Sequence, residues 1–166
     1  MRKPKVVCFR YKRYNDVYVS NVPFLNDILI SMLDAFLDRK IIVMIESDEN
    51  YIKTLSSISQ NIEISEIMPR LYASRFSAVC NKKDLICLIK QVNVKNLSGM
   101  FMANVNNDII TDEFIYAFDR IAGDVVKDGM SDVSISIDFP ENQIVISLSK
   151  EKYMSMSIKE KICNMF

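Results

Sequence analysis

The stretch that decides the fold is VPFLNDILISMLDAFLDRK, residues 22–40, followed directly by IIVMIES, residues 41–47. In the first part, apolar side chains recur every three or four residues, the spacing of one face of an amphipathic helix. The second part is an unbroken apolar run with polar residues after it, and such runs are typical of strands covered on both faces. A helix joined to a buried strand by so short a connection predicts a layered domain of helices and sheet.

The rest of the chain supplies further strands and helices for this unit. Strand-like runs occupy residues 5–11, 17–20, 62–67, 70–80 and 99–105, and helical patterns occupy 49–60, 82–92, 111–128 and 156–165. Two alternating runs, 132–139 and 144–148, flank Pro140-Glu141-Asn142 and predict an antiparallel hairpin with one polar face. We therefore predict an α/β protein of the mixed α+β kind. It has a mixed β-sheet with helices packed on it and a C-terminal antiparallel hairpin.

Length and composition point to one folded domain over residues 1–166. A chain of 166 residues with 49% hydrophobic and 25% charged residues lies close to the average for globular domains. If the chain is subdivided at all, we expect the boundary near residues 106–111, in the polar stretch NNDIIT.

The four cysteines indicate a reducing environment. Cys8, Cys80, Cys87 and Cys163 form no C-x-x-C pair, and each lies in an apolar context in which a free cysteine is expected to be buried. The N-terminus lacks the apolar run of a signal peptide, and no stretch is long and apolar enough for a membrane span. We predict a cytosolic protein with free thiols.

Missing residue types exclude several chemistries. The chain has no histidine, which removes Ser-His-Asp and Cys-His catalysis and any imidazole zinc site. Its three glycines, Gly99, Gly123 and Gly129, form neither a dinucleotide-binding fingerprint nor a P-loop, because both motifs need closely spaced glycines to approach phosphate. No cofactor is expected, and an enzyme is the less favoured interpretation.

The remaining candidates for chemistry are the acids after the buried strand. Glu46, Asp48 and Glu49 follow the strand end, where open α/β sheets place ligands, and their oxygens suit a hard cation such as magnesium. The alternative is that these acids leave the sheet and cap the helix over residues 49–60.

The N-terminus is basic and aromatic. Residues 1–13 carry six cations and no acid, interleaved with Phe9 and Tyr11 and followed by Tyr14. Aromatic and cationic side chains in such a pattern can stack on bases and hold phosphates. On a strand, however, Phe9 and Tyr11 share one face while Arg10 and Lys12 lie on the other. We favour an exposed strand edge protected by charge.

A later segment is acidic. Residues 108–141 carry nine acids against Arg120 and Lys127. Charge complementarity gives fast and selective association with a partner of opposite sign. The candidate partner-binding residues are Asp112, Asp119, Asp124, Asp132 and Asp138.

On these grounds we interpret the chain as a small protein-binding module. The specific hypothesis is an inhibitor or immunity-type protein that neutralises a basic partner through its acidic surface. Two alternatives stay open: a metal-dependent enzyme acting on phosphoesters through Glu46 and Asp48, and a nucleic-acid binder acting through residues 2–13. The sequence does not determine the oligomeric state.

Overall fold

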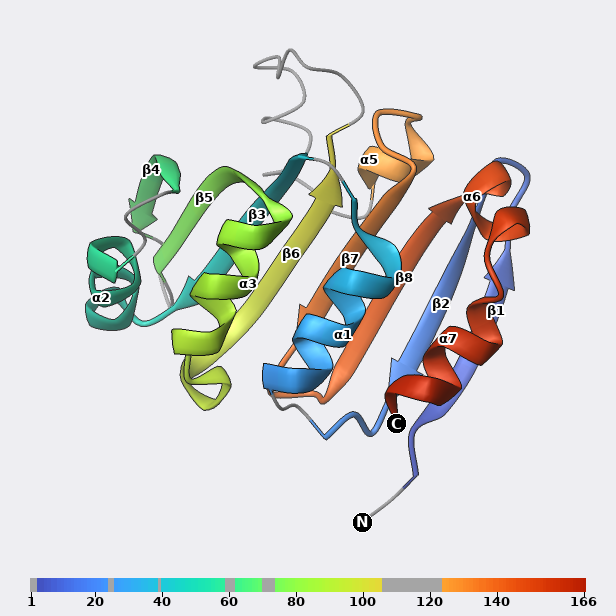
Figure 1. The fold of residues 1–166 in the computed structure, drawn as a ribbon, viewed down its shortest axis with the longest axis horizontal. Helices are drawn as coiled ribbons and strands as arrows, with labels where there is room; N and C mark the ends of the chain where they lie inside the picture. The colour runs from blue at the N-terminus through green and yellow to red at the C-terminus, as the bar shows by residue number, and fades with distance from the viewer. Residues whose placement is uncertain (1–2, 24–25, 39, 59–61, 70–73, 106–123) are drawn as a thin grey trace.

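The structure is a computed structural model that describes residues 3–23, 26–38, 40–58, 62–69, 74–105 and 124–166. Within these ranges the chain forms one eight-stranded sheet, six α-helices and one 3₁₀ turn (Figure 1). The strands are β1 (Lys5–Arg10), β2 (Tyr14–Ser20), β3 (Lys40–Ser47), β4 (Glu63–Pro69), β5 (Ser74–Asn81), β6 (Leu97–Asn104), β7 (Val133–Asp138) and β8 (Gln143–Ser149). The helices are α1 (Asn26–Phe36), α2 (Glu49–Ile58), α3 (Lys82–Gln91), η1 (Val94–Asn96), α5 (Asp124–Lys127), α6 (Lys150–Ser155) and α7 (Ile158–Met165).

The strands lie in the order β1-β2-β8-β7-β6-β3-β5-β4. Every pairing between described strands is antiparallel, so the α+β class and the C-terminal hairpin are confirmed, while the predicted mixture of strand directions is not found. The expectation of parallel strands came from the uniformly apolar β3. That pattern requires only cover on both faces, and an antiparallel strand can have this cover too.

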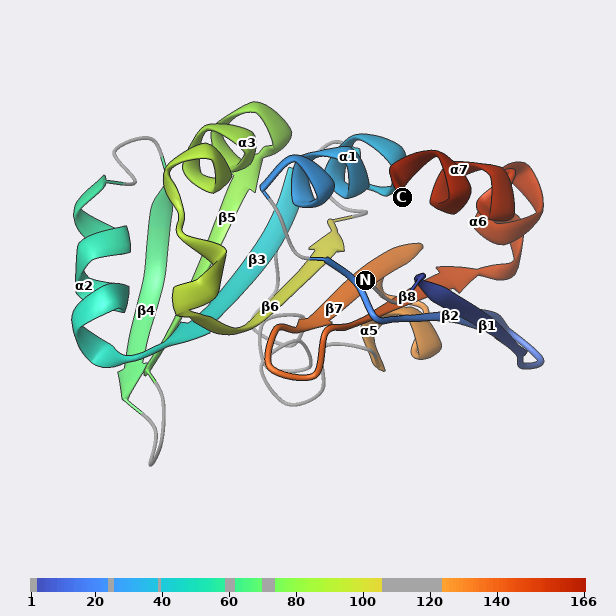
Figure 2. The ribbon, with the colours of Figure 1, turned by 90° about the horizontal axis from the view of Figure 1, so that it is seen from below.

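Helices cover the two faces of the sheet unequally. Figure 2 shows α3, α1, α7 and α6 in a row on one face and α5 on the other. From β3, Ile41, Val43 and Ile45 point into the main core beneath the row of helices, and Ile42 and Met44 point into a smaller cluster that includes two valines of α5. All five are at most 2% exposed, as predicted for a strand covered on both sides.

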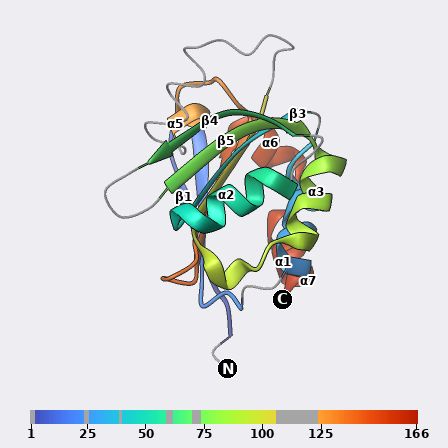
Figure 3. The same ribbon diagram turned by 90° about the vertical axis from the view of Figure 1, so that its left-hand side faces the viewer.

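Helix α2 extends the same core at one end of the sheet. In Figure 3 it lies beside β4 and β5, and its Ile52 and Leu55 are fully buried with the main core. Helix α1 and strand β3 contribute to the same main core, so the pattern of residues 22–47 correctly predicted a layer of helices on a sheet.

Local polar residues fix the ends of several elements. The Asp84 N–H donates to the Asn81 side chain at 2.8 Å, so Asn81 caps the first turn of α3. Gly129 has a φ of +75° just after α5, the left-handed conformation that glycine adopts most easily. Asn142 has a φ of 52° in the turn between β7 and β8, where the hairpin turn was predicted.

Other sequence predictions are wrong or lie outside the described residues. Most of the helix predicted over residues 111–128, and the boundary predicted near 106–111, lie outside the described residues. Helix α6 was not predicted, because it has no buried residue and so no apolar stripe.

All four thiols are free and Cys80 is buried, but Cys87 and Cys163 are exposed, contrary to the prediction that all four are buried. An apolar sequence context does not fix which side of a helix a residue occupies.

Candidate functional site

The acids proposed as metal ligands are engaged elsewhere. Arg75 donates through Nε to Glu46 Oε1 at 2.8 Å and also pairs with it through Nη2. Gly99 opposite Glu46 leaves room for this carboxylate, since a Cβ there would lie 3.2 Å from Glu46 Oε2. The pair is largely buried, with the Arg75 side chain 7% exposed and that of Glu46 21% exposed.

The two acids that follow belong to α2. The Tyr51 N–H donates to Asp48 Oδ1 at 2.9 Å, so Asp48 caps the first turn of the helix as the alternative interpretation predicted. Glu49 pairs with Lys53 at 2.6 Å one turn along. The described part of the chain holds no group of three or more acid or cysteine side chains placed to bind a metal ion.

The structure does not gather the described members of the acidic set. Asp132 lies just before β7 and Asp138 ends it, so they stand at opposite ends of one strand. The Asp138 carboxylate accepts from the Glu141 N–H at 3.1 Å within the hairpin turn. Asp112 and Asp119 lie outside the described residues, and Asp124 begins α5 with its side chain undescribed.

Asp132 instead joins a polar network centred on a buried asparagine. Asn104, which is 1% exposed, donates through Nδ2 to Asp38 Oδ1 at 2.9 Å and to Asp132 Oδ1 at 3.0 Å. Lys152 lies 3.5 Å from Asp38 and 3.6 Å from Asp132. The network ties the end of α1, the end of β6, the start of β7 and helix α6 together, which is a structural role.

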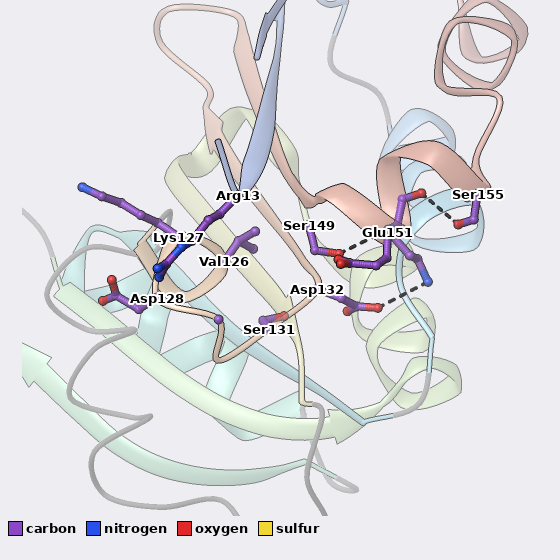
Figure 4. Close-up of a pocket in the computed structure, with 11 residues that line it drawn as sticks. Arg13, Val126, Lys127, Asp128, Ser131, Asp132, Ser149, Glu151 and Ser155 are labelled. Carbon is purple, nitrogen blue, oxygen red and sulfur yellow. Dashed lines mark hydrogen bonds and ion pairs between the residues drawn. The ribbon is translucent and has the colours of Figure 1, made fainter. Parts of the chain in front are cut away.

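A polar pocket of about 600 Å³ opens beside this network. Figure 4 shows Arg13 and Lys127 on one side of it, Ser149, Glu151 and Ser155 on the other, and Asp132 between them. Its lining contains three cations, Arg13, Lys127 and Lys152, and three acids, Asp128, Asp132 and Glu151. Because these charges balance, the pocket has no net charge with which to select an anion or a cation.

The exposed apolar surface lies elsewhere, on the ribbon formed by β1 and β2. Seven large apolar or aromatic residues are exposed in the described chain, and five of them belong to this ribbon. Each of the five is between 38% and 47% exposed: Val6, Val7, Phe9, Tyr11 and Tyr18. We call residues 5–20 the β1–β2 ribbon.

Aromatic contacts order one face of this ribbon. Phe9 meets Tyr18 edge to face with ring centroids 5.2 Å apart, and Tyr11 stacks on Tyr14 at 4.5 Å. Burial, together with the nearby Asp16 carboxylate and Tyr11, raises the pKa of Tyr18, so its hydroxyl stays neutral and can donate a hydrogen bond. The prediction that β1 is an exposed strand edge is confirmed, because β1 ends the sheet.

The register of the ribbon shows which backbone groups of β1 are unpaired. The Tyr11 N–H donates to the Tyr14 carbonyl at 2.9 Å, and hydrogen-bonded pairs then alternate with non-bonded pairs along the ladder. Following the register, Lys5, Val7 and Phe9 direct their backbone groups to β2. Val6, Cys8 and Arg10 therefore direct N–H and C=O away from the sheet, where no described strand lies.

The free edge is also the basic part of the chain. Lys5, Arg10, Lys12 and Arg13 are exposed along the strand and its turn, and no acid occurs before Asp16. Asp16 lies on the aromatic face, where its carboxylate accepts from Ser147 Oγ at 2.7 Å. The ribbon therefore carries more cations than acids, and Asp16 is the one acid among residues 5–20.

No protein-family model matches the chain, and no curated protein matches it either. Among the described residues, no helix has the length and apolar character needed to cross a membrane. Sequence reasoning identified Phe9 and Tyr11 but missed Val6 and Tyr18, because a strand pattern does not tell which of its apolar residues lack a covering helix.

Proposed function

We propose that this protein is a protein-binding module and that the β1–β2 ribbon is its contact surface. The observation that carries the proposal is the clustering of five of the seven exposed large apolar residues on this one ribbon. By the strand register, Val7, Phe9 and Tyr18 share one face of the ribbon and Val6 lies on the other. Scattered single exposures need no explanation, whereas a contiguous group such as Val7, Phe9 and Tyr18 is typical of an interaction surface. Tyrosine and arginine are also the residue types that contribute most to protein interfaces.

The composition of the ribbon favours a protein over a nucleic acid. Its aromatic rings contact one another, and the Asp16 carboxylate within the same face repels phosphate. The four free thiols support a reducing compartment for the interaction. The acidic surface over residues 112–138 stays a prediction, as does an inhibitor or immunity role, and the proposal does not depend on either.

A capture experiment with matched variants tests the proposal. Phe9→Ser combined with Tyr18→Ser removes the aromatic contact, and Met154→Ser removes an exposed apolar residue of helix α6, 83% exposed, that is not part of the ribbon. From native lysate, we expect wild type and Met154→Ser to recover the same proteins and the double variant to lose them. Equal recovery by all three, with circular dichroism showing that each is folded, refutes the proposal. Recovery of nuclease-sensitive material alone favours the nucleic-acid alternative.

A further inference from the structure

We infer that the partner segment is an extended, acidic strand that pairs with the free edge of β1 and adds a ninth strand to the sheet. This inference rests on the proposed function and specifies its ligand. An exposed edge strand is a template for another strand, because its unpaired N–H and C=O groups supply main-chain hydrogen bonds.

The backbone of β1 offers a short and well-defined template. Val6, Cys8 and Arg10 each direct an N–H and a C=O outward, which follows from the ladder counted from the Tyr11–Tyr14 turn. Pro4 precedes the strand and has no N–H to donate, so pairing along the edge is limited to these residues.

Side chains beside this template specify what the added strand should carry. Val7 and Phe9 lie on the face with Tyr18, where apolar side chains of a neighbouring strand would contact them. Lys5 and Arg10, near the two ends of the edge, are exposed cations without an ion pair among the described residues. Arg10 lies on the opposite face from Val7 and Phe9, so an added strand that alternates apolar and acidic residues would set its apolar side chains beside Val7 and Phe9 and its acids beside Arg10.

The charge also argues against a second copy of β1 as the occupant. If two β1 strands paired antiparallel about Cys8, with the outward residues Val6 and Arg10 of one copy opposite those of the other, Lys5 and Arg10 of both copies would line one seam with no acid from either strand to offset them. Like charges gathered in this way repel each other. The observed charge pattern therefore favours a partner of opposite sign.

Two synthetic nine-residue peptides test the inference with the full-length protein. One alternates valine with glutamate and the other alternates valine with lysine, and each is titrated into isotopically labelled protein while amide shifts are followed by NMR. We expect the glutamate peptide to bind, with the largest shifts at Val6, Cys8 and Arg10, and the lysine peptide not to bind. Binding should weaken as salt is raised, because the attraction of exposed charges is screened.

A pair of variants at one position separates strand addition from nonspecific binding of the peptide. Val6→Pro removes one outward N–H, and Val6→Thr keeps that N–H with a similar branched side chain. We expect Val6→Pro to weaken glutamate-peptide binding about tenfold and Val6→Thr to leave it nearly unchanged, since one hydrogen bond is lost only in the first. Unchanged amide shifts across β3 and β6 show that both variants fold.

The outcomes separate this inference from the proposed function. Equal binding of both peptides overturns the acidic partner, and equal binding by Val6→Pro and Val6→Thr overturns strand addition. So does a β1-mediated dimer that blocks the edge, detected by sedimentation. If peptide binding fails while the Phe9 and Tyr18 double variant still loses its captured proteins, the contact surface stands and only the acidic strand is wrong. If both experiments fail, the proposed function falls as well.

Discussion

Replacing Asn104 with alanine is expected to destabilise the fold by removing the buried centre of the polar network. Asn104 makes three hydrogen bonds through its side chain: two donated to the carboxylates of Asp38 and Asp132, and one accepted from the Asp38 N–H at 3.0 Å. Hydrogen bonds to charged groups contribute roughly 1.5–3 kcal/mol each, and a neutral one contributes about 1 kcal/mol. The full sum is an upper limit, because the two carboxylates can regain water.

The exposure of the two carboxylates determines how far the cost of Asn104→Ala falls below this sum. The Asp38 side chain is 55% exposed and the Asp132 side chain is 32% exposed, so both are rehydrated in part once the amide is gone. The remaining cost is the unpaired Asp38 N–H and the vacated space. We expect Asn104→Ala to lower the free energy of unfolding by about 2–4 kcal/mol. Urea denaturation followed by circular dichroism measures this change, with an unchanged slope against denaturant.

The matched variant Asn104→Asp gives a pH signature. Its new carboxyl group lies against two existing carboxylates, so the pKa of that group is raised in the folded state above its unfolded value of about 3.9. The folded state then favours the protonated form, and the penalty is small at low pH and grows as pH rises above about 4. A cost below about 0.5 kcal/mol for Asn104→Ala, or no growth of the Asn104→Asp penalty with pH, refutes this reading of the network.

Three further predictions concern the ion pairs, the thiols and a turn. Arg75→Met leaves Glu46 partly buried without its partner and should cost about 2–4 kcal/mol in urea denaturation, whereas Lys53→Met at an exposed pair should cost under about 0.5 kcal/mol; equal costs would contradict the burial argument. Burial raises the pKa of Cys80 to about 12, so its thiol stays protonated and should resist alkylation at pH 8 in the folded protein while Cys87 and Cys163 react; peptide mass spectrometry that found Cys80 modified first would contradict this. Gly129→Ala forces a side chain into a φ of +75° and should lower stability by roughly 1 kcal/mol, which thermal denaturation can detect; an unchanged or higher melting temperature would count against the strain.

The central fold could be predicted because its signals are local. The apolar run of β3, the cap at Asn81 and the alternating hairpin of β7 and β8 each reflect a residue pattern read within a few positions. Strand direction could not be predicted, because the apolar run of β3 would be the same whether its neighbouring strands were parallel or antiparallel to it. Helix α6 was missed because its formation depends on the Ser149 cap and not on an apolar face.

The proposed contact surface was only partly predictable for a similar reason. The basic and aromatic N-terminus indicated an exposed edge, and β1 is such an edge. By contrast, the network of Asp38, Asn104 and Asp132 joins residues 66 and 28 positions apart, and only the tertiary fold shows that Asp132 is engaged there. Which amides of β1 point outward also depends on the register set by its turn.

Residue-resolved amide hydrogen exchange of the free protein tests the central claim most directly. Strand β1 has one edge paired with β2 and one free edge. We predict that the Val6, Cys8 and Arg10 amides exchange rapidly, while the alternating Val7, Phe9 and Tyr11 amides are protected by β2. Equal protection at all six positions would contradict the account, because it would mean that the outer edge of β1 is already covered.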